Sequence, residues 1–162
     1  MKLATLCYIR QNNKILMIHR NKNKNDMHLG KWNGLGGKIK AGESPEECVI
    51  REVFEESGLL IKNPSLKGFI TFPAFDDIED WYVFIFCAFE FDGHLKTESD
   101  EGRLEWIEEN SILSLPLWDG DRIFLKWLDN RNFFSAKFNY DKGSLIDYTV
   151  IFYPSVEGDC IS

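Results

Sequence analysis

Residues 37–59 read GKIKAGESPEECVIREVFEESGL, and their spacing predicts a short helix with clear start and stop signals. Ser44 suits the capping position, Pro45 the first helical position, and Glu47 completes a capping box with Ser44. Gly58 suits the left-handed position that commonly follows the last helical residue. These signals predict a helix that begins at Pro45 and ends just before Gly58.

Three glutamates of this helix, Glu52, Glu55 and Glu56, fall within one arc of about 100°. Their crowding destabilises an isolated helix, because Glu52 and Glu56 are like charges four residues apart. A hard divalent cation such as Mg²⁺ would offset that charge, since it prefers carboxylate oxygens, and Arg51 can pair with Glu55 at i,i+4. A solvated acidic surface is the alternative. We place the apolar residues of the helix on the opposite, core-facing side: Val49, Ile50, Val53 and Phe54.

The same string resembles the signature of the Nudix hydrolases, G-x5-E-x7-R-E-U-x-E-E-x-G-U, in which U is aliphatic. The match holds at every specified position: Gly37, Glu43, Arg51, Glu52, Val53, Glu55, Glu56, Gly58 and Leu59. The resemblance implies an α/β fold, the Nudix α/β/α sandwich with a mixed central sheet. It also implies Mg²⁺-dependent hydrolysis of a nucleoside diphosphate linked to another moiety, with Mn²⁺ as a possible substitute for Mg²⁺.

The resemblance further assigns roles to individual residues. It implies that Glu52, Glu55 and Glu56 bind the metal with a backbone carbonyl at Gly36 or Gly37, and that Glu43 tethers the loop to the helix. Arg51 would hold a carboxylate in place. Outside the signature, Glu101 resembles an additional metal ligand or general base, with Glu98 and Asp100 as nearby competitors and Glu56 as the alternative base.

Length, charge and cysteine content limit the class of protein. The 162 residues, 44% of them hydrophobic, suit one domain spanning residues 1–162. The absence of a signal-peptide pattern or long apolar run favours a cytoplasmic protein without membrane contact. The widely spaced Cys7, Cys48, Cys87 and Cys160 suggest buried free thiols, with Cys48 a small spacer beside the acidic face.

Charge is distributed unevenly along the chain. The net charge of −7 argues against a nucleic-acid partner, although residues 1–42 carry nine Lys or Arg and one acid. Within this basic segment, Arg20 and Lys38 are the candidates for contact with a triphosphate. We expect a small-molecule nucleotide as the partner and a monomer or weak dimer as the oligomeric state.

Aromatic and β-branched runs predict the remaining elements. A hairpin of residues 3–10 and 14–19 turns at Asn12-Asn13, and strands 66–75 and 81–91 flank the acidic turn DDIED, which we expect to be solvated. The other predicted elements are a strand over 103–107, a helix over 119–128 and a hairpin of 133–140 and 145–152.

Beyond the signature, the chain resembles MutT-type oxidised-purine triphosphatases over most of its length. The shared segments are WNGLGGK (32–38), ESDE (98–101), LWDGD (117–121), FFSAKF (133–138) and LIDYT (145–149). The resemblance implies a base pocket containing Asn33, Phe72, Trp118 and an acid, Asp119 or Asp121. Asp119 is equally a candidate helix cap.

Such a pocket suits a purine, because aromatic faces stack on the base and a buried acceptor reads its edge. 8-Oxoguanine has a donor at N7, where guanine has an acceptor. The leading hypothesis is therefore hydrolysis of 8-oxo-dGTP to 8-oxo-dGMP and pyrophosphate. The alternatives are a Nudix hydrolase of another nucleotide, such as an undamaged triphosphate, ADP-ribose or a dinucleoside polyphosphate, and a catalytically silent nucleotide-binding domain.

Overall fold

The computed structural model describes residues 1–154, in which a mixed β-sheet lies between two helices. Its strands run in the order β10-β9-β5-β6-β1-β2-β3, with β8 also paired to β2. The pairs β1–β6 and β5–β9 are parallel and the others are antiparallel. The strands of this sheet are β1 Lys2–Gln11, β2 Lys14–Arg20, β3 Trp32–Asn33, β5 Ser65–Phe72, β6 Trp81–Ala88, β8 Gly102–Glu108, β9 Phe133–Asp141 and β10 Ser144–Tyr153.

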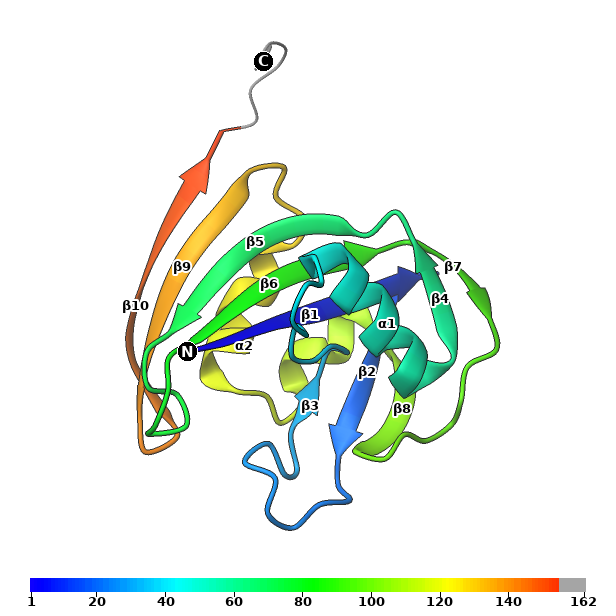
Figure 1. Ribbon diagram of the computed structural model, residues 1–162, viewed down its shortest axis with the longest axis horizontal. Helices are drawn as coiled ribbons and strands as arrows, with labels where there is room; N and C mark the ends of the chain where they lie inside the picture. Colours follow the sequence, from blue (N-terminus) through cyan, green and yellow to red (C-terminus); the bar gives the residue numbers. More distant parts are fainter. Residues whose placement is uncertain (155–162) are drawn as a thin grey trace.

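Each face of the sheet carries its own hydrophobic cluster under one helix. In Figure 1, helix α1 (Pro45–Ser57) lies in front of the sheet and α2 (Asp119–Phe124) behind it. Val49 and Val53 of α1 pack with residues of β1 and β2 on one side. Phe124 of α2 packs with residues of β5, β6 and β9 on the other. The expected α/β/α sandwich with a mixed sheet is confirmed.

Helix α1 begins and ends where its local signals predict. Ser44 accepts the amide of Glu47 at 3.1 Å, and the Glu47 carboxylate accepts the amide of Ser44 at 3.0 Å. Gly58 follows the helix in the left-handed conformation, with φ 81°. Phe54 departs from the prediction because it is 53% exposed. The strip of α1 that contacts the sheet is narrow, and Phe54 lies about 100° beyond Val53 around the helix axis.

The strand predicted over 66–75 ends early, at Phe72. The next residue is Pro73, which has no amide to donate to a neighbouring strand. The acidic turn that follows is more than a solvated loop, since Asp76 accepts the indole N–H of Trp81 at 3.1 Å. Asp80 accepts the amide of Ala74 at 2.9 Å. These carboxylates organise the turn that ends at β6.

Two other predicted elements are divided in the structure. The strand expected over 81–91 leaves the main sheet after Ala88, and β7 (Glu90–Gly93) pairs instead with β4 (Leu59–Lys62) in a two-stranded sheet. The helix expected over 119–128 is α at its start and continues as the 3-10 helix η2 (Leu125–Trp127). A further 3-10 helix, η1 (Glu109–Ser114), follows β8.

The thiols of Cys7, Cys48 and Cys87 are buried and free, as predicted, while Cys160 lies outside the described residues. Cys48 lies between α1 and β1, where its Sγ is 3.4 Å from the Thr5 hydroxyl. In the part of the chain that the structure describes, no helix is long and apolar enough to span a membrane.

Replacing Ser44 with alanine removes the side-chain acceptor of the capping box. We expect the free energy of unfolding to fall by about 1 kcal/mol, because one amide in the first turn of α1 loses its partner. Urea denaturation measures the change. The control is Ser144→Ala, at the exposed start of β10, which should alter stability by less than about 0.5 kcal/mol. Equal losses in both variants would contradict a capping role.

Candidate functional site

A glycine-rich loop, residues 34–38, lies along β1 and forms one wall of the site. The loop pairs with the strand through backbone hydrogen bonds, including Thr5 N to Gly37 O at 2.9 Å and Leu35 N to Cys7 O at 3.0 Å. A Cβ at position 36 would lie 2.0 Å from the carbonyl oxygen of Thr5. Only glycine permits this approach, which brings the loop backbone level with the glutamates of α1.

Two of the predicted glutamates point at this loop. Glu56 is buried, and its Oε1 accepts the amide of Gly36 at 3.2 Å. The carboxylate of Glu52 lies against Gly37, where an added Cβ would be 2.5 Å from Glu52 Cδ. Glu55, by contrast, has a side chain 54% exposed and does not line the cavity described below.

Arg51 ties the loop to the helix. Its guanidinium donates to both oxygens of Glu43, at 2.6 and 2.9 Å, and to the Lys38 carbonyl at 3.2 Å. It also reaches Glu52 at 2.8 Å and Glu55 at 3.3 Å. The hydrogen bonds from Arg51 lower the pKa of Glu43 to about 2, so this carboxylate stays ionised. The tether expected at Glu43 is therefore present.

The carboxylates nearest the loop differ in how their charge is balanced, since Glu52 pairs with Arg51 and Glu101 with Arg20, while Glu56 has no salt bridge among the described residues. Burial raises the pKa of Glu56 to about 8, with the charges of Glu101 and Glu52 adding to the effect. Burial also raises the pKa of Glu101, which lies across the cavity at 2.9 Å from Arg20. A hard cation with oxygen ligands fits this donor set.

The carboxylates are not gathered into a finished metal site. Within residues 1–154, no three acidic, histidine or cysteine side chains converge as ligands. Arg51 holds one oxygen of Glu52 and turns Glu55 outward. The Gly37 carbonyl also departs from its expected role, because it already accepts hydrogen bonds from the Thr5 amide and hydroxyl. Gly36 is thus the better carbonyl candidate of the two.

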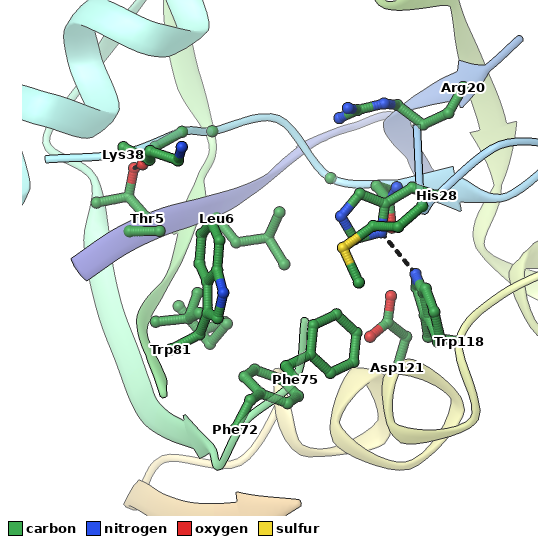
Figure 2. Close-up of a pocket in the computed structure, with 18 of the residues that line it drawn as sticks. Thr5, Leu6, Arg20, His28, Lys38, Phe72, Phe75, Trp81, Trp118 and Asp121 are labelled. Atoms are coloured by element: carbon green, nitrogen blue, oxygen red, sulfur yellow. Dashed lines mark hydrogen bonds between the residues drawn. The ribbon is translucent and has the colours of Figure 1, made fainter. Parts of the chain in front are cut away.

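Glu52 and Glu101 line a cavity of about 440 Å³ that has a polar end and an aromatic end, and Glu56 lies behind the loop, outside the cavity lining. Figure 2 shows Arg20 and Lys38 along one side of the cavity and Phe72 and Phe75 along the opposite side. Arg20 also bonds Asp26 at 2.8 Å, so it is held between two acids. The Lys38 ammonium lies over the ring of Trp81.

The aromatic end contains two buried polar side chains, Asn33 and Asp121, and both line the cavity. Among the described residues, neither side chain makes a hydrogen bond. Burial raises the pKa of Asp121 to about 7, although Lys31 and Arg122 oppose the shift. Both side chains therefore face the cavity with hydrogen-bonding capacity that a ligand could use.

Trp118 forms a wall of the aromatic end, and the neighbouring rings lie at steep angles to its own ring. Its indole N–H donates to Nδ1 of His28 at 2.7 Å, drawn as the dashed line in Figure 2. The ring makes further edge contacts with Phe75 and Tyr140. Burial lowers the pKa of His28 to about 4, so the imidazole is neutral at pH 7 and accepts this bond.

Asp119 fulfils neither of its expected roles. Its side chain is exposed, lies outside the cavity lining and accepts the Leu145 amide at 3.2 Å. The residue that precedes helix α2 is Trp118, and no side chain caps it. As the first helical residue, Asp119 points toward β10 and joins the helix to that strand.

The cavity also includes side chains that the sequence did not single out: Thr5, Leu6, Met27, His28, Phe75, Trp81, Val83, Ile85, Phe124 and Tyr140. His28 lies in a polar loop with no periodic pattern, and Tyr140 belongs to a strand remote from the signature. Phe75 and Trp81 flank the acidic turn, and aromatic residues beside a turn are candidates for stacking on a base, so this pattern could have identified both.

Comparisons with known proteins agree with this arrangement. A family model described as the NUDIX domain matches residues 1–128. The chain is 36% identical to the uncharacterized Nudix hydrolase YvcI of Bacillus subtilis (strain 168), covering 77% of each. It is 32% identical to the oxidized purine nucleoside triphosphate hydrolase of Danio rerio, covering 90% of each. The crystal structure of a mutator MutT protein from Bacillus halodurans superimposes with a TM-score of 0.84 and 32% identity, covering 93% of this chain and 97% of that one.

The raised pKa of Asp121 predicts a stability that depends on pH. Between the ordinary aspartate pKa and about 7, the unfolded chain has lost this proton and the folded protein keeps it. Wild-type stability therefore falls as pH rises through this window, by on the order of a few kcal/mol from this group. Asp121→Asn removes the titrating group.

We expect the melting temperature of Asp121→Asn, relative to wild type, to be higher at about pH 8 than at about pH 5. Thermal unfolding at the two pH values measures this difference. Asp119→Asn, with its exposed side chain, is the matched control for loss of one charge. A difference between Asp121→Asn and wild type that does not change with pH would refute the assignment.

Proposed function

Because the chain belongs to the Nudix hydrolase family and acts on nucleotide phosphoanhydrides, we propose that its substrate is an oxidised purine nucleoside triphosphate. In this proposal 8-oxo-dGTP is hydrolysed to 8-oxo-dGMP and pyrophosphate. The observation that carries it is a pair of largely buried polar side chains, Asn33 and Asp121, that face the aromatic end of a cavity whose polar end includes Glu52 and Glu101.

The polar end supports hydrolysis of a phosphoanhydride. Nudix hydrolases generally need a divalent metal such as Mg²⁺, and here Glu52, Glu56, Glu101 and the Gly36 carbonyl would hold it, with Mn²⁺ as a substitute. Bound there, the metal supplies neutralisation of phosphate charge and activation of water. Lys38 and Arg20 lie on the same side of the cavity and would contact phosphate oxygens. Glu101 would accept the proton of the attacking water, with Glu56 as the alternative.

The aromatic end supports recognition of a damaged base. Trp118 and Phe72 present apolar faces on which a purine can stack. The carboxylate of Asp121 and the amide oxygen of Asn33 are acceptors, and the N7–H of 8-oxoguanine is a donor. Guanine places an acceptor at N7 instead, so binding it leaves buried groups unpaired and repelling.

These features suit an enzyme that removes damaged nucleotides before they are incorporated into DNA. The proposal includes a cytoplasmic location, a single domain and action as a monomer or weak dimer on a free nucleotide.

Glu56→Gln should lower kcat by roughly 10²-fold or more, because the amide cannot ionise to hold a metal beside the loop. Release of pyrophosphate, measured with and without Mg²⁺, tests this. Glu46→Gln, on the exposed first turn of the same helix, is the control and should retain wild-type activity. Near-normal turnover by Glu56→Gln would end the assignment of the glutamate site, and wild-type protein inactive with Mg²⁺ would support the silent-domain alternative.

For the substrate, we expect kcat/KM for 8-oxo-dGTP to exceed that for dGTP by roughly 10²-fold or more. The comparison uses one Mg²⁺ concentration and includes 8-oxo-GTP, ADP-ribose and a dinucleoside polyphosphate. Asn33→Ala should reduce the preference for the oxidised base more than it changes the Mg²⁺ dependence. Equal kcat/KM for dGTP and 8-oxo-dGTP would exclude nucleotide-pool sanitation.

A further inference from the structure

Tyr140, near the end of β9, reaches helix α2 at the aromatic end of the cavity. Its hydroxyl oxygen accepts the amide N–H of Gly120 at 2.6 Å. A Cβ on residue 120 would lie 2.7 Å from this oxygen and 3.0 Å from Phe138. The phenol therefore occupies the space that a side chain at position 120 would need, beside Asp121.

The position of the ring is fixed from several sides. Tyr140 contacts Phe72, Phe75 and Trp118, with ring centroids 5.1 to 6.3 Å apart. All four residues line the cavity. The hydroxyl is therefore held in place at the aromatic end of the cavity, beside Asp121.

The hydroxyl still has its own proton to donate. Its oxygen accepts from Gly120, so its own proton remains to be donated. Within residues 1–154, the bond to Gly120 is the only hydrogen bond that this hydroxyl makes. Burial raises the pKa of Tyr140 well above its ordinary value, so the phenol keeps its proton at any assay pH.

We propose that Tyr140 is a specificity-determining residue whose hydroxyl donates to the carbonyl oxygen O6 of a 6-oxopurine. The inference rests on the proposed function. It extends recognition of the base from its size and its oxidation at C8 to the substituent at C6. Asp121 needs a donor and Tyr140 needs an acceptor, so the site fits a base edge that presents the two side by side. In a 6-oxopurine, O6 has N1–H on one side and, when C8 is oxidised, N7–H on the other.

A 6-aminopurine presents the wrong group to Tyr140. Its amino group directs a donor at a hydroxyl whose oxygen already accepts from Gly120. An amino group cannot accept the hydroxyl proton, so the Tyr140 donor is left without a partner inside the cavity, which is unfavourable. The geometry therefore predicts preference for 6-oxopurine over 6-aminopurine triphosphates, which Asn33 alone would not enforce because an amide both donates and accepts.

The test measures, for two proteins, how much kcat/KM changes between two nucleotides, and compares the two changes. Wild type and Tyr140→Phe are each assayed with dGTP and with 6-thio-dGTP, in which a weakly accepting sulfur replaces O6 and N1–H is kept. In wild type we expect the sulfur to lower kcat/KM by roughly fivefold to tenfold, and in Tyr140→Phe by less than about twofold. Tyr148→Phe, on β10 with a side chain that makes ring contacts only, is the matched control and should behave as wild type.

A structural role for the hydroxyl predicts another result. Loss of the Gly120 bond alone would lower kcat/KM for both nucleotides by the same factor, and that outcome would overturn the proposal. Should Tyr140→Phe fail to fold, 3-fluorotyrosine at position 140 keeps the acceptor for Gly120 and is a stronger donor. Its discrimination against 6-thio-dGTP should equal or exceed that of wild type, and weaker discrimination would overturn the proposal.

This test is independent of whether the enzyme prefers oxidised bases, because both nucleotides have an unmodified C8. Similar rates on dGTP and 8-oxo-dGTP would exclude the proposed function, but the comparison of dGTP with 6-thio-dGTP could still be interpreted. A preserved preference for 8-oxo-dGTP with no coupling to Tyr140 would remove only the role of Tyr140.

Discussion

The hydrogen bonds between strand β1 and the loop of residues 34–38 are the constraint on which the site depends. They fix the backbone of Gly36 at a distance that only glycine allows, since a Cβ there would overlap the Thr5 carbonyl, and they place Gly37 against the carboxylate of Glu52. Glu56 can then accept the Gly36 amide, and Glu52 can lie against Gly37. Without this pairing, the glutamates of α1 would face solvent and would form an ordinary acidic helix surface.

Charge balance makes the same region both stable and ready to bind. Arg51 neutralises the outer carboxylates, Glu43 above all, and so joins loop and helix without help from a ligand. Glu101 pairs with Arg20, whereas the buried Glu56 has no salt bridge among the described residues, and its raised pKa keeps it protonated near pH 7. The protein therefore folds without an unpaired charge at Glu56, and a cation bound there would displace its proton.

How far the sequence predicts the structure depends on how local each signal is. The caps of α1 and the turn at Asn12-Asn13 follow from residues a few positions apart, and the structure agrees with them. The split between β6 and β7 and the pairing of β7 with β4 were not predicted, because they depend on contacts between distant segments. Pro73, a local signal, would have corrected the end of β5.

The candidate site shows the same division. Its glutamate end lies on one helix and one loop, so spacing alone brings Glu52 and Glu56 together. Its aromatic end combines His28, Phe75, Trp118 and Tyr140 from four separate segments, and no spacing in the sequence connects them. The prediction that fails, Asp119, also belongs to the aromatic end. Asp119 follows the buried Trp118 by one residue, and a step of one residue on a helix turns a side chain by about 100°.

The contact between Gly120 and Tyr140 links two positions that are 20 residues apart in the chain. A larger residue at position 120 requires a smaller one at 140, because the two side chains would claim one volume. Position 120 therefore cannot enlarge while Tyr140 is present, although residue 140 can become smaller on its own. Building a side chain at position 120 to suit a new base means exchanging residue 140 in the same step.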